Sequence, residues 1–185
     1  MILITGPNGG GKTSLLRTIL RLQSPTKGRI SFFRQGEPVS SLDMGYLPQK
    51  NSIDSRFPIT VEEVVASGLM GNTQKGNTKF DSKKEIDEML DLMGITALRN
   101  KPIGVLSGGQ LQRSLFGRAL ISKPEMLILD EPASYIDRQF GNRMFEILRD
   151  LSSNGTTIMM VSHEIEPFIT LSNRNLYINH ILGDR

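Results

Sequence analysis

The sequence feature that most constrains this chain is a glycine-rich loop near its beginning. Residues 6–13 read GPNGGGKT, which fits the pattern G-x-x-x-x-G-K-[ST]. The apolar run Ile2-Leu3-Ile4 before the loop is typical of a strand, and the apolar residues after Thr13 recur at helical spacing. A loop between a strand and a helix can aim backbone N–H groups and the positive helix end at one anion. The stretch therefore predicts a phosphate-binding loop, and the alternative is a glycine-rich turn that matches by chance.

The pattern assigns separate tasks to the residues of the loop. Lys12 is expected to reach the β- and γ-phosphates of a nucleotide, and the hydroxyl of Thr13 is expected to bind Mg²⁺. The backbone around them is expected to cradle the phosphates. The predicted nucleotide-binding residues of this stretch are Gly6, Pro7, Asn8, Gly9, Gly10, Gly11, Lys12, Thr13 and Ser14.

Strand and helix patterns alternate along most of the chain. Apolar or β-branched runs predict strands at 30–33, 44–47, 126–129, 156–161 and 176–178. Helical spacing separates several of them, so the expected fold class is α/β, with a mostly parallel sheet. Ligands on such sheets bind at the carboxyl ends of the strands. The glycine loop, Asp130-Glu131 and His163 all follow predicted strands, which suggests one shared site.

A helical section interrupts the α/β pattern. Thr60 with Glu63, and Ser82 with Glu85, each fit a capping box that begins a helix. The polar residues 71–79 between them are interpreted as a mobile connector, and Gly94 is expected to stop the second helix. We therefore expect an inserted helical subdomain at 51–113 between two parts of the P-loop core, 1–50 and 114–185.

Two adjacent carboxylates end the apolar stretch MLILDE at residues 126–131. Asp130 is expected to hold Mg²⁺ through its water shell, and Glu131 to orient the attacking water or accept its proton. A solvated turn with a helix-capping acid is the alternative, which the presence of the phosphate loop disfavours.

A second anion-binding pattern lies at residues 106–113, LSGGQLQR. Ser107-Gly108-Gly109 opens a predicted helix and offers a hydroxyl, bare backbone N–H groups and a positive helix end. One nucleotide has one triphosphate, and the first loop already cradles it. The second pattern therefore suggests that two copies of the chain share nucleotides head to tail. The alternative is that residues 107–109 simply begin an ordinary glycine-opened helix.

The motifs together resemble the ATP-binding-cassette (ABC) ATPases of ABC transporters, with a P-loop NTPase fold. LSGGQ is similar to the family signature letter for letter, and the set stands in family order over nearly the whole chain. The resemblance implies that Gln49 contacts Mg²⁺ and water, that His163 contacts the γ-phosphate, and that Asp137 in SYID couples two sites. It also implies ATP as cofactor. In a dimer, Ser107, Gly108, Gly109 and Gln110 are expected to contact the nucleotide of the opposite protomer.

Residues 46–69 resemble the ATPases of manganese and zinc importers. That resemblance implies integral membrane permease subunits, a substrate-binding protein and a location on the cytoplasmic face of the membrane. An importer of iron complexes, a soluble ABC protein acting on DNA or ribosomes, and a nucleotide-sensing module remain alternatives. The net charge of +3 gives no indication of a nucleic acid partner, and cysteine is absent, which fits a reducing compartment.

The sequence also departs from the family pattern. Met1 stands inside the strand before the phosphate loop, so the leading strand pair and its adenine-stacking aromatic residue are expected to be missing. Ile136 stands where the family often has leucine. His180 matches no motif and is interpreted as a surface residue.

Overall fold

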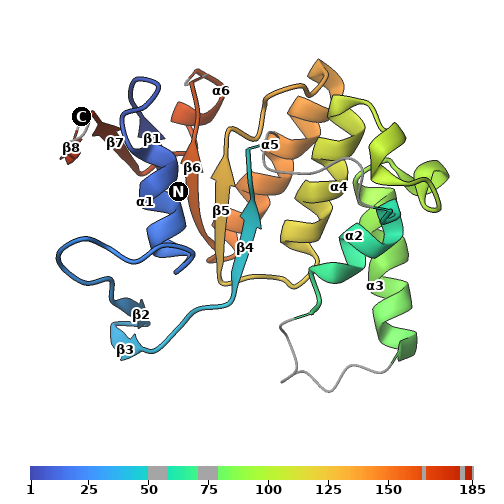
Figure 1. Ribbon diagram of the computed structural model, residues 1–185, viewed down its shortest axis with the longest axis horizontal. Coiled ribbons are helices and arrows are strands. Elements are labelled where there is room, and N and C mark those ends of the chain that lie inside the picture. The colour runs from blue at the N-terminus through green and yellow to red at the C-terminus, as the bar shows by residue number, and fades with distance from the viewer. Residues whose placement is uncertain (50–57, 71–78, 164–165, 180–181, 185) are drawn as a thin grey trace.

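The computed structural model describes residues 1–49, 58–70, 79–163, 166–179 and 182–184 (Figure 1). His180 and nearly all of the predicted connector 71–79 lie outside the described residues. No helix in this described part is long and apolar enough to cross a membrane.

A mixed but mostly parallel sheet organises the fold, as predicted. Its strands stand in the order β4-β5-β6-β1-β7-β8, and only the β7–β8 pair is antiparallel. The strands are β1 (Ile2–Thr5), β4 (Met44–Leu47), β5 (Met126–Asp130), β6 (Thr157–Val161), β7 (Arg174–Ile178) and β8 (Leu182–Asp184). The predicted strands at 44–47, 126–129, 156–161 and 176–178 are confirmed to within two residues. The short strand β8 was not predicted.

The predicted strand at 30–33 is displaced. The strand β2 (Phe32–Arg34) pairs only with β3 (Glu37–Val39), in an antiparallel hairpin outside the main sheet (Figure 1). The two residues of its turn, Gln35 and Gly36, both have positive φ, of 53° and 88°. That geometry is typical of the tight turns of hairpins, and the turn residues NG or DG that would have signalled it are absent.

Helices cover both faces of the sheet. The helices are α1 (Lys12–Ile19), α2 (Val61–Ser67), α3 (Lys79–Leu92), α4 (Gly108–Leu120), α5 (Arg138–Ser153) and α6 (Glu166–Ile169), with 3₁₀ turns η3 (Thr96–Leu98) and η4 (Ile103–Val105). Every residue of β5 is buried, because the strand is covered on both sides. Met126 and Ile128 pack in one cluster with Leu16 of α1, whereas Leu127 and Leu129 join the larger cluster with α4 and α5.

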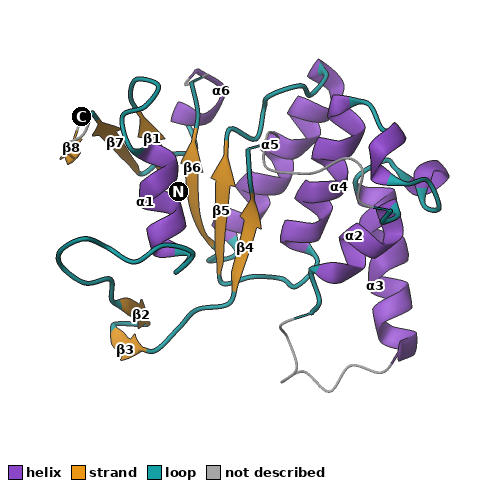
Figure 2. Ribbon diagram, in the orientation of Figure 1, coloured by secondary structure: helices purple, strands orange, loops and turns teal. Residues whose placement is uncertain are grey.

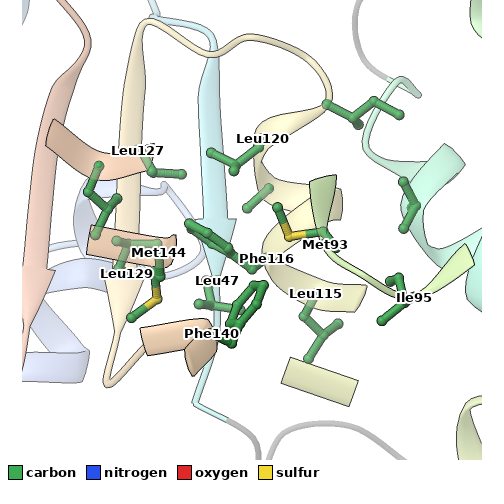
Figure 3. Packing of buried hydrophobic residues seen from close by; sticks show 14 of the residues in the cluster. Leu47, Met93, Ile95, Leu115, Phe116, Leu120, Leu127, Leu129, Phe140 and Met144 are labelled. Atoms are coloured by element: carbon green, nitrogen blue, oxygen red, sulfur yellow. The ribbon is translucent and has the colours of Figure 1, made fainter. Parts of the chain in front are cut away.

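The larger cluster joins the sheet to the helical section. Figure 3 shows Phe116 of α4 beside Leu47 of β4 and close to Phe140 and Met144 of α5. The rings of Phe116 and Phe140 meet edge to face, with centroids 6.5 Å apart. Since α4 contacts both β4 and the helices of the section, it fixes the section to the core.

The helical section lies to one side of the sheet, where α2, α3 and α4 gather (Figure 2). The predicted capping box at Thr60 is confirmed, because its hydroxyl accepts from Glu63 N–H and the Glu63 carboxylate accepts from Thr60 N–H. The predicted helix start at Ser82 is wrong, since α3 begins at Lys79. No glycine or proline separates Lys79 from Ser82, so the helix continues upstream and the same four-residue spacing falls inside it.

Gly68 shows how closely these helices approach. A Cβ atom on Gly68 would lie 2.1 Å from the carbonyl oxygen of Arg118 in α4, a distance that forbids any side chain. Because α4 runs from residue 108 to 120, it crosses the predicted subdomain boundary at 113. The division at 1–50, 51–113 and 114–185 stays a prediction.

Candidate functional site

The glycine loop turns sharply between β1 and α1. Gly6 has φ 143°, and a Cβ atom there would lie 1.9 Å from the carbonyl oxygen of Ile178 in β7, so only glycine fits. Gly11 precedes α1 at φ 99° and, in the described chain, no side chain caps this helix end. The N–H groups at the start of α1, which lack intrahelical acceptors, are therefore left for an anion.

Lys12 lies across this loop. It is buried, at 6% exposed, and its Nζ donates to the carbonyl oxygens of Gly6 and Pro7, both at 2.9 Å. These two contacts hold the buried ammonium group of Lys12 against the backbone of the loop. A buried cation beside open N–H donors is suited to a strongly negative ligand.

Thr13 and Asp130 meet behind the loop. The Thr13 hydroxyl donates to Oδ2 of Asp130 at 3.0 Å, although the two residues come from α1 and β5. Asp130 is 1% exposed, and this burial raises the pKa of its carboxyl, against the lowering effect of the Thr13 hydrogen bond.

The donor set at this point fits Mg²⁺. A hydroxyl and a carboxylate are hard oxygen ligands, and Mg²⁺ in such sites keeps waters and takes further ligands from substrate phosphates. The described residues contain no group of three or more His, Cys, Asp or Glu side chains that could hold a metal ion alone. A magnesium ion here would therefore need the phosphates that the adjacent loop is shaped to hold.

Glu131 and His163 face each other across the same cleft. His163 Nε2 lies 2.8 Å from Oε1 of Glu131, and Glu131 takes φ 54° while its N–H donates to the carbonyl of Val161. This left-handed backbone interrupts the extended chain directly after β5. Such strain in a non-glycine residue persists only where the surroundings hold it.

These residues line one cleft of about 430 Å³. Its lining consists of Asn8, Gly9, Gly10, Gly11, Lys12, Thr13, Ser14, Gln49, Glu131 and His163. We call this the phosphate cleft. Three further predicted residues touch this lining without belonging to it, since Gly6 and Pro7 accept from Lys12 and Asp130 accepts from Thr13. The structure thus gathers the glycine loop, the Asp130-Glu131 pair and His163, the three stretches expected at one strand edge, and adds Gln49 to them.

The second predicted pattern lies in a different place. A cleft of about 550 Å³ is lined by Gly94, Leu98, Ser107, Gly108, Gly109, Gln110, Arg113, Tyr135 and Asp137, and we call it the signature cleft. Ser107 caps α4: its hydroxyl accepts from Gln110 N–H at 3.3 Å, and its own N–H donates to Gln110 Oε1 at 3.0 Å. The Gln110 amide therefore holds the start of its own helix.

Within the described residues the two clefts have no lining residue in common. The chain does not bring Ser107–Gln110 or Asp137 next to its own phosphate loop. Both clefts are built around the first turn of a helix, but on separate parts of the molecule.

Sequence reasoning missed several residues of the signature cleft. Gly94, Leu98, Arg113 and Tyr135 line it without having been predicted as site residues. Arg113 carried a usable signal, because it follows Gln110 by three positions and thus lies on the same side of α4. Tyr135 lies in a loop, where spacing gives no such information.

Known proteins similar to this chain include a protein family and several named ATP-binding proteins. Residues 1–134 match the ABC transporter family. A Chlamydia pneumoniae protein named as the ATP-binding protein of a metal transport system is 40% identical over 97% of this chain and 74% of its own length. The zinc uptake system ATP-binding protein ZurA of Listeria monocytogenes is 38% identical over 97% of this chain and 70% of its own length.

Solved structures agree on the fold. The dimeric ATP-binding cassette MJ0796 bound to ADP and phosphate has a TM-score of 0.82 at 23% identity, over 100% of this chain and 84% of that one. The order of the motifs, the phosphate cleft and the curated relatives all lead to one assignment. The chain belongs to the ABC transporter family and is one of its ATP-hydrolysing subunits.

Proposed function

We propose that this chain hydrolyses ATP to drive the import of a metal cation, of the zinc or manganese kind, through membrane permease subunits. The relatives named for zinc uptake and zinc import support the choice of cargo. The observation that carries the ATPase chemistry is the phosphate cleft, where the loop, Gln49, Glu131 and His163 face one space.

Each residue of the phosphate cleft has a task in this proposal. The open end of α1 and the buried charge of Lys12 bind the phosphates and offset the charge that develops on the γ-phosphoryl group. Thr13 and Asp130, with Gln49, would hold Mg²⁺, which would supply neutralisation of the phosphate charge. The remaining step, attack by water, falls to residues on the other wall of the cleft.

Glu131 orients the attacking water or accepts its proton. Its carboxylate already contacts His163 Nε2 at 2.8 Å, so the two side chains hold each other in place. When a γ-phosphate enters the cleft, His163 is positioned to donate to it while Glu131 turns toward the water. A general base needs to be within hydrogen-bond reach of the proton it takes, and the position of Glu131 in the same cleft as the phosphate loop supports this role.

A second copy of the chain completes the site. The start of α4 in the signature cleft offers N–H groups of Gly108 and Gly109 and the Ser107 hydroxyl, but the phosphate loop of the same chain lies elsewhere. We therefore propose a head-to-tail homodimer in which each signature cleft meets the nucleotide held by the partner. Asp137, at the edge of the signature cleft, is proposed to couple the two sites.

The cargo passes through other subunits. The helical section 51–113 is proposed to bind the permease at the cytoplasmic face of the membrane, and a substrate-binding protein to deliver the metal. The metal cation is cargo, so the chain itself needs no binding site for it. Import of an iron complex is the second candidate, and DNA- or ribosome-linked activity is the third.

A transport experiment tests the cargo. Cells that carry the chain with its permease subunits are supplied with radioactive zinc, manganese or a ferric chelate, each in turn. The proposal expects uptake of zinc or manganese that is lost in the Lys12→Ala variant and kept in Lys123→Ala, which alters an exposed lysine. Uptake of the ferric chelate alone would establish the second candidate, and copurification with ribosomes or DNA without a permease the third.

A further inference from the structure

Two neighbouring residues of α4 connect the signature cleft to the segment that follows Glu131. Arg113 forms an ion pair with Asp137, and Gln112 Nε2 donates to the carbonyl oxygen of Pro132 at 3.2 Å. The segment 132–137 is thus held to α4 at both of its ends. Glu131, which immediately precedes it, lies in the phosphate cleft.

Asp137 is engaged through both of its carboxylate oxygens. Oδ2 accepts from Arg113, and Oδ1 accepts at 3.0 Å from the N–H of Phe140, so that Asp137 caps α5. These contacts lower the pKa of Asp137, chiefly through the Phe140 hydrogen bond and then through Arg113. The carboxylate is therefore ionised, and both of its oxygens accept hydrogen bonds from groups of its own chain.

Arg113 is held from a second side as well. Its guanidinium lies over the ring of Phe140, with the central carbon 4.4 Å from the ring centroid. A planar guanidinium that stacks on a ring and also pairs with a carboxylate loses little freedom per contact. The Arg113 side chain is 23% exposed and that of Asp137 is 54% exposed, so the ion pair is partly open to solvent and the stack on Phe140 adds to its hold on Arg113.

Two backbone-level contacts reinforce the connection. Gln112 is 1% exposed, so its hydrogen bond to Pro132 is buried. Gly109 lies directly against the Tyr135 carbonyl, because a Cβ atom at Gly109 would come within 2.8 Å of that oxygen. The start of α4 and the segment 132–137 therefore pack too closely to shift independently.

The geometry points to Arg113 as a positioning residue for ATP hydrolysis, which locks Asp137 and the segment after Glu131 to the signature helix. The inference rests on the proposed function, because it assumes that the signature cleft meets a partner's nucleotide. Binding at the signature cleft then fixes Glu131 through contacts inside one chain. In this arrangement Asp137 fixes the end of the segment 132–137, and the Arg113 side chain joins that end to α4.

Kinetics of an Arg113→Ala variant tests the positioning role. Arg113 is absent from the lining of the phosphate cleft, so ATP affinity measured without turnover should stay within about twofold of the parent chain. Turnover should fall about 10- to 100-fold, the loss that a misplacement of about 1 Å causes. Arg113→Lys keeps the charge but loses the planar stacking, and should recover part of the turnover.

A matched control removes another arginine of an ion pair. Arg149 pairs with Asp150 on α5, with its side chain 55% exposed, and Arg149→Ala should keep full turnover. Arg113→Ala and Asp137→Ala should be non-additive when combined, because either one breaks the same connection. Full additivity, or normal turnover in Arg113→Ala, would overturn the inference while leaving the ATPase assignment intact.

A measurement without nucleotide tests the connection even if the isolated chain turns over no ATP. Hydrogen exchange at the Phe140 amide, which donates to Asp137, should accelerate in Arg113→Ala and not in Arg149→Ala. Unchanged exchange would show that Arg113 does not hold Asp137. Absence of ATP hydrolysis by the parent chain in the presence of its permease would instead count against the proposed function.

Discussion

Each of the two clefts is built around the start of a helix, but the two helix starts differ in their capping and in their charge. In the phosphate cleft, α1 begins at Lys12, whose charge is buried, and in the described chain no side chain caps this helix start. In the signature cleft, Ser107 and Gln110 cap α4 reciprocally, and the charge of Arg113 is paired with Asp137. The phosphate cleft can attract an anion alone, whereas the signature cleft is suited to one that is already bound elsewhere.

This difference makes the clefts unequal in what they contribute. The phosphate cleft should determine whether ATP binds. The signature cleft should determine whether bound ATP is hydrolysed. Variants in the two clefts therefore affect different measured quantities.

The largest effect is expected at Lys12. Lys12→Ala removes the buried cation that the phosphate cleft depends on, so ATP binding should weaken and turnover should fall by about 10²-fold or more. ATP affinity by titration calorimetry and phosphate release are the measurements. Lys123→Ala, which alters an exposed lysine, serves as the control. Equal ATP affinity in Lys12→Ala and the parent chain would contradict the role of the phosphate cleft.

A second variant separates binding from hydrolysis within the phosphate cleft. Glu131→Gln keeps the size of the side chain and removes its basicity, so turnover should fall about 10²- to 10⁴-fold while ATP affinity persists. Because this variant binds ATP without hydrolysing it, the protein should sediment as a dimer in the presence of MgATP. A variant that binds ATP but stays monomeric would contradict the proposal that both clefts hold one nucleotide in a dimer.

A smaller effect is expected from the signature cleft. Gly109→Ala would place a Cβ atom 2.8 Å from the Tyr135 carbonyl, so the start of α4 must shift. We expect a turnover loss of about tenfold or more, with ATP affinity unchanged, because Gly109 does not line the phosphate cleft. Gly141→Ala, where an added Cβ meets nothing within 4 Å, is the matched control. A loss of ATP affinity in Gly109→Ala would show that both clefts contribute to ATP binding, which contradicts the proposed difference between them.

The smallest effect concerns stability in the absence of nucleotide. Burial raises the pKa of Asp130, so its ionised form destabilises the folded chain at neutral pH. Asp130→Asn keeps an acceptor for the Thr13 hydroxyl and removes the charge. The melting temperature at pH 7 should rise by about 2–4 °C, which corresponds to about 1 kcal/mol in a chain of this size.

The pH dependence of this gain follows from the direction of the shift. A carboxyl with a raised folded-state pKa disfavours folding above that pKa and ceases to do so as the pH falls below the unfolded value of about 4. The advantage of Asp130→Asn should therefore shrink from pH 7 toward pH 4, as measured by thermal melts. A gain that is constant over this range would mean that the charge of Asp130 is not the cause.

The sequence predicted the phosphate cleft better than the signature cleft. The phosphate cleft is built from strand ends, and the parallel sheet places Gly6, Asp130 and His163 at one edge once the strands are known. The contact between His163 and Glu131 depends on the left-handed backbone of Glu131, which no local pattern signals. Motif order indicated that these residues share a site, but not that they touch.

The contacts of the signature cleft join residues far apart in the chain. Arg113 and Asp137 lie 24 positions apart, and they meet near the contact between Phe116 of α4 and Phe140 of α5. The helix start at Ser82 failed for the opposite reason, since a correct local pattern occurred inside a longer helix. Local patterns thus identified the motifs, whereas tertiary packing determined which residues hold them.

In the proposed dimer, one nucleotide is used by the phosphate cleft of one chain and the signature cleft of another. The most direct test mixes two inactive variants, Lys12→Ala and Ser107→Arg, and measures ATP hydrolysis. Between two such chains, one composite site combines an intact phosphate cleft with an intact signature cleft. Mixing should therefore restore part of the turnover that each variant lacks alone. Turnover that stays at the level of the separate variants, while they still form mixed dimers with MgATP, would contradict it.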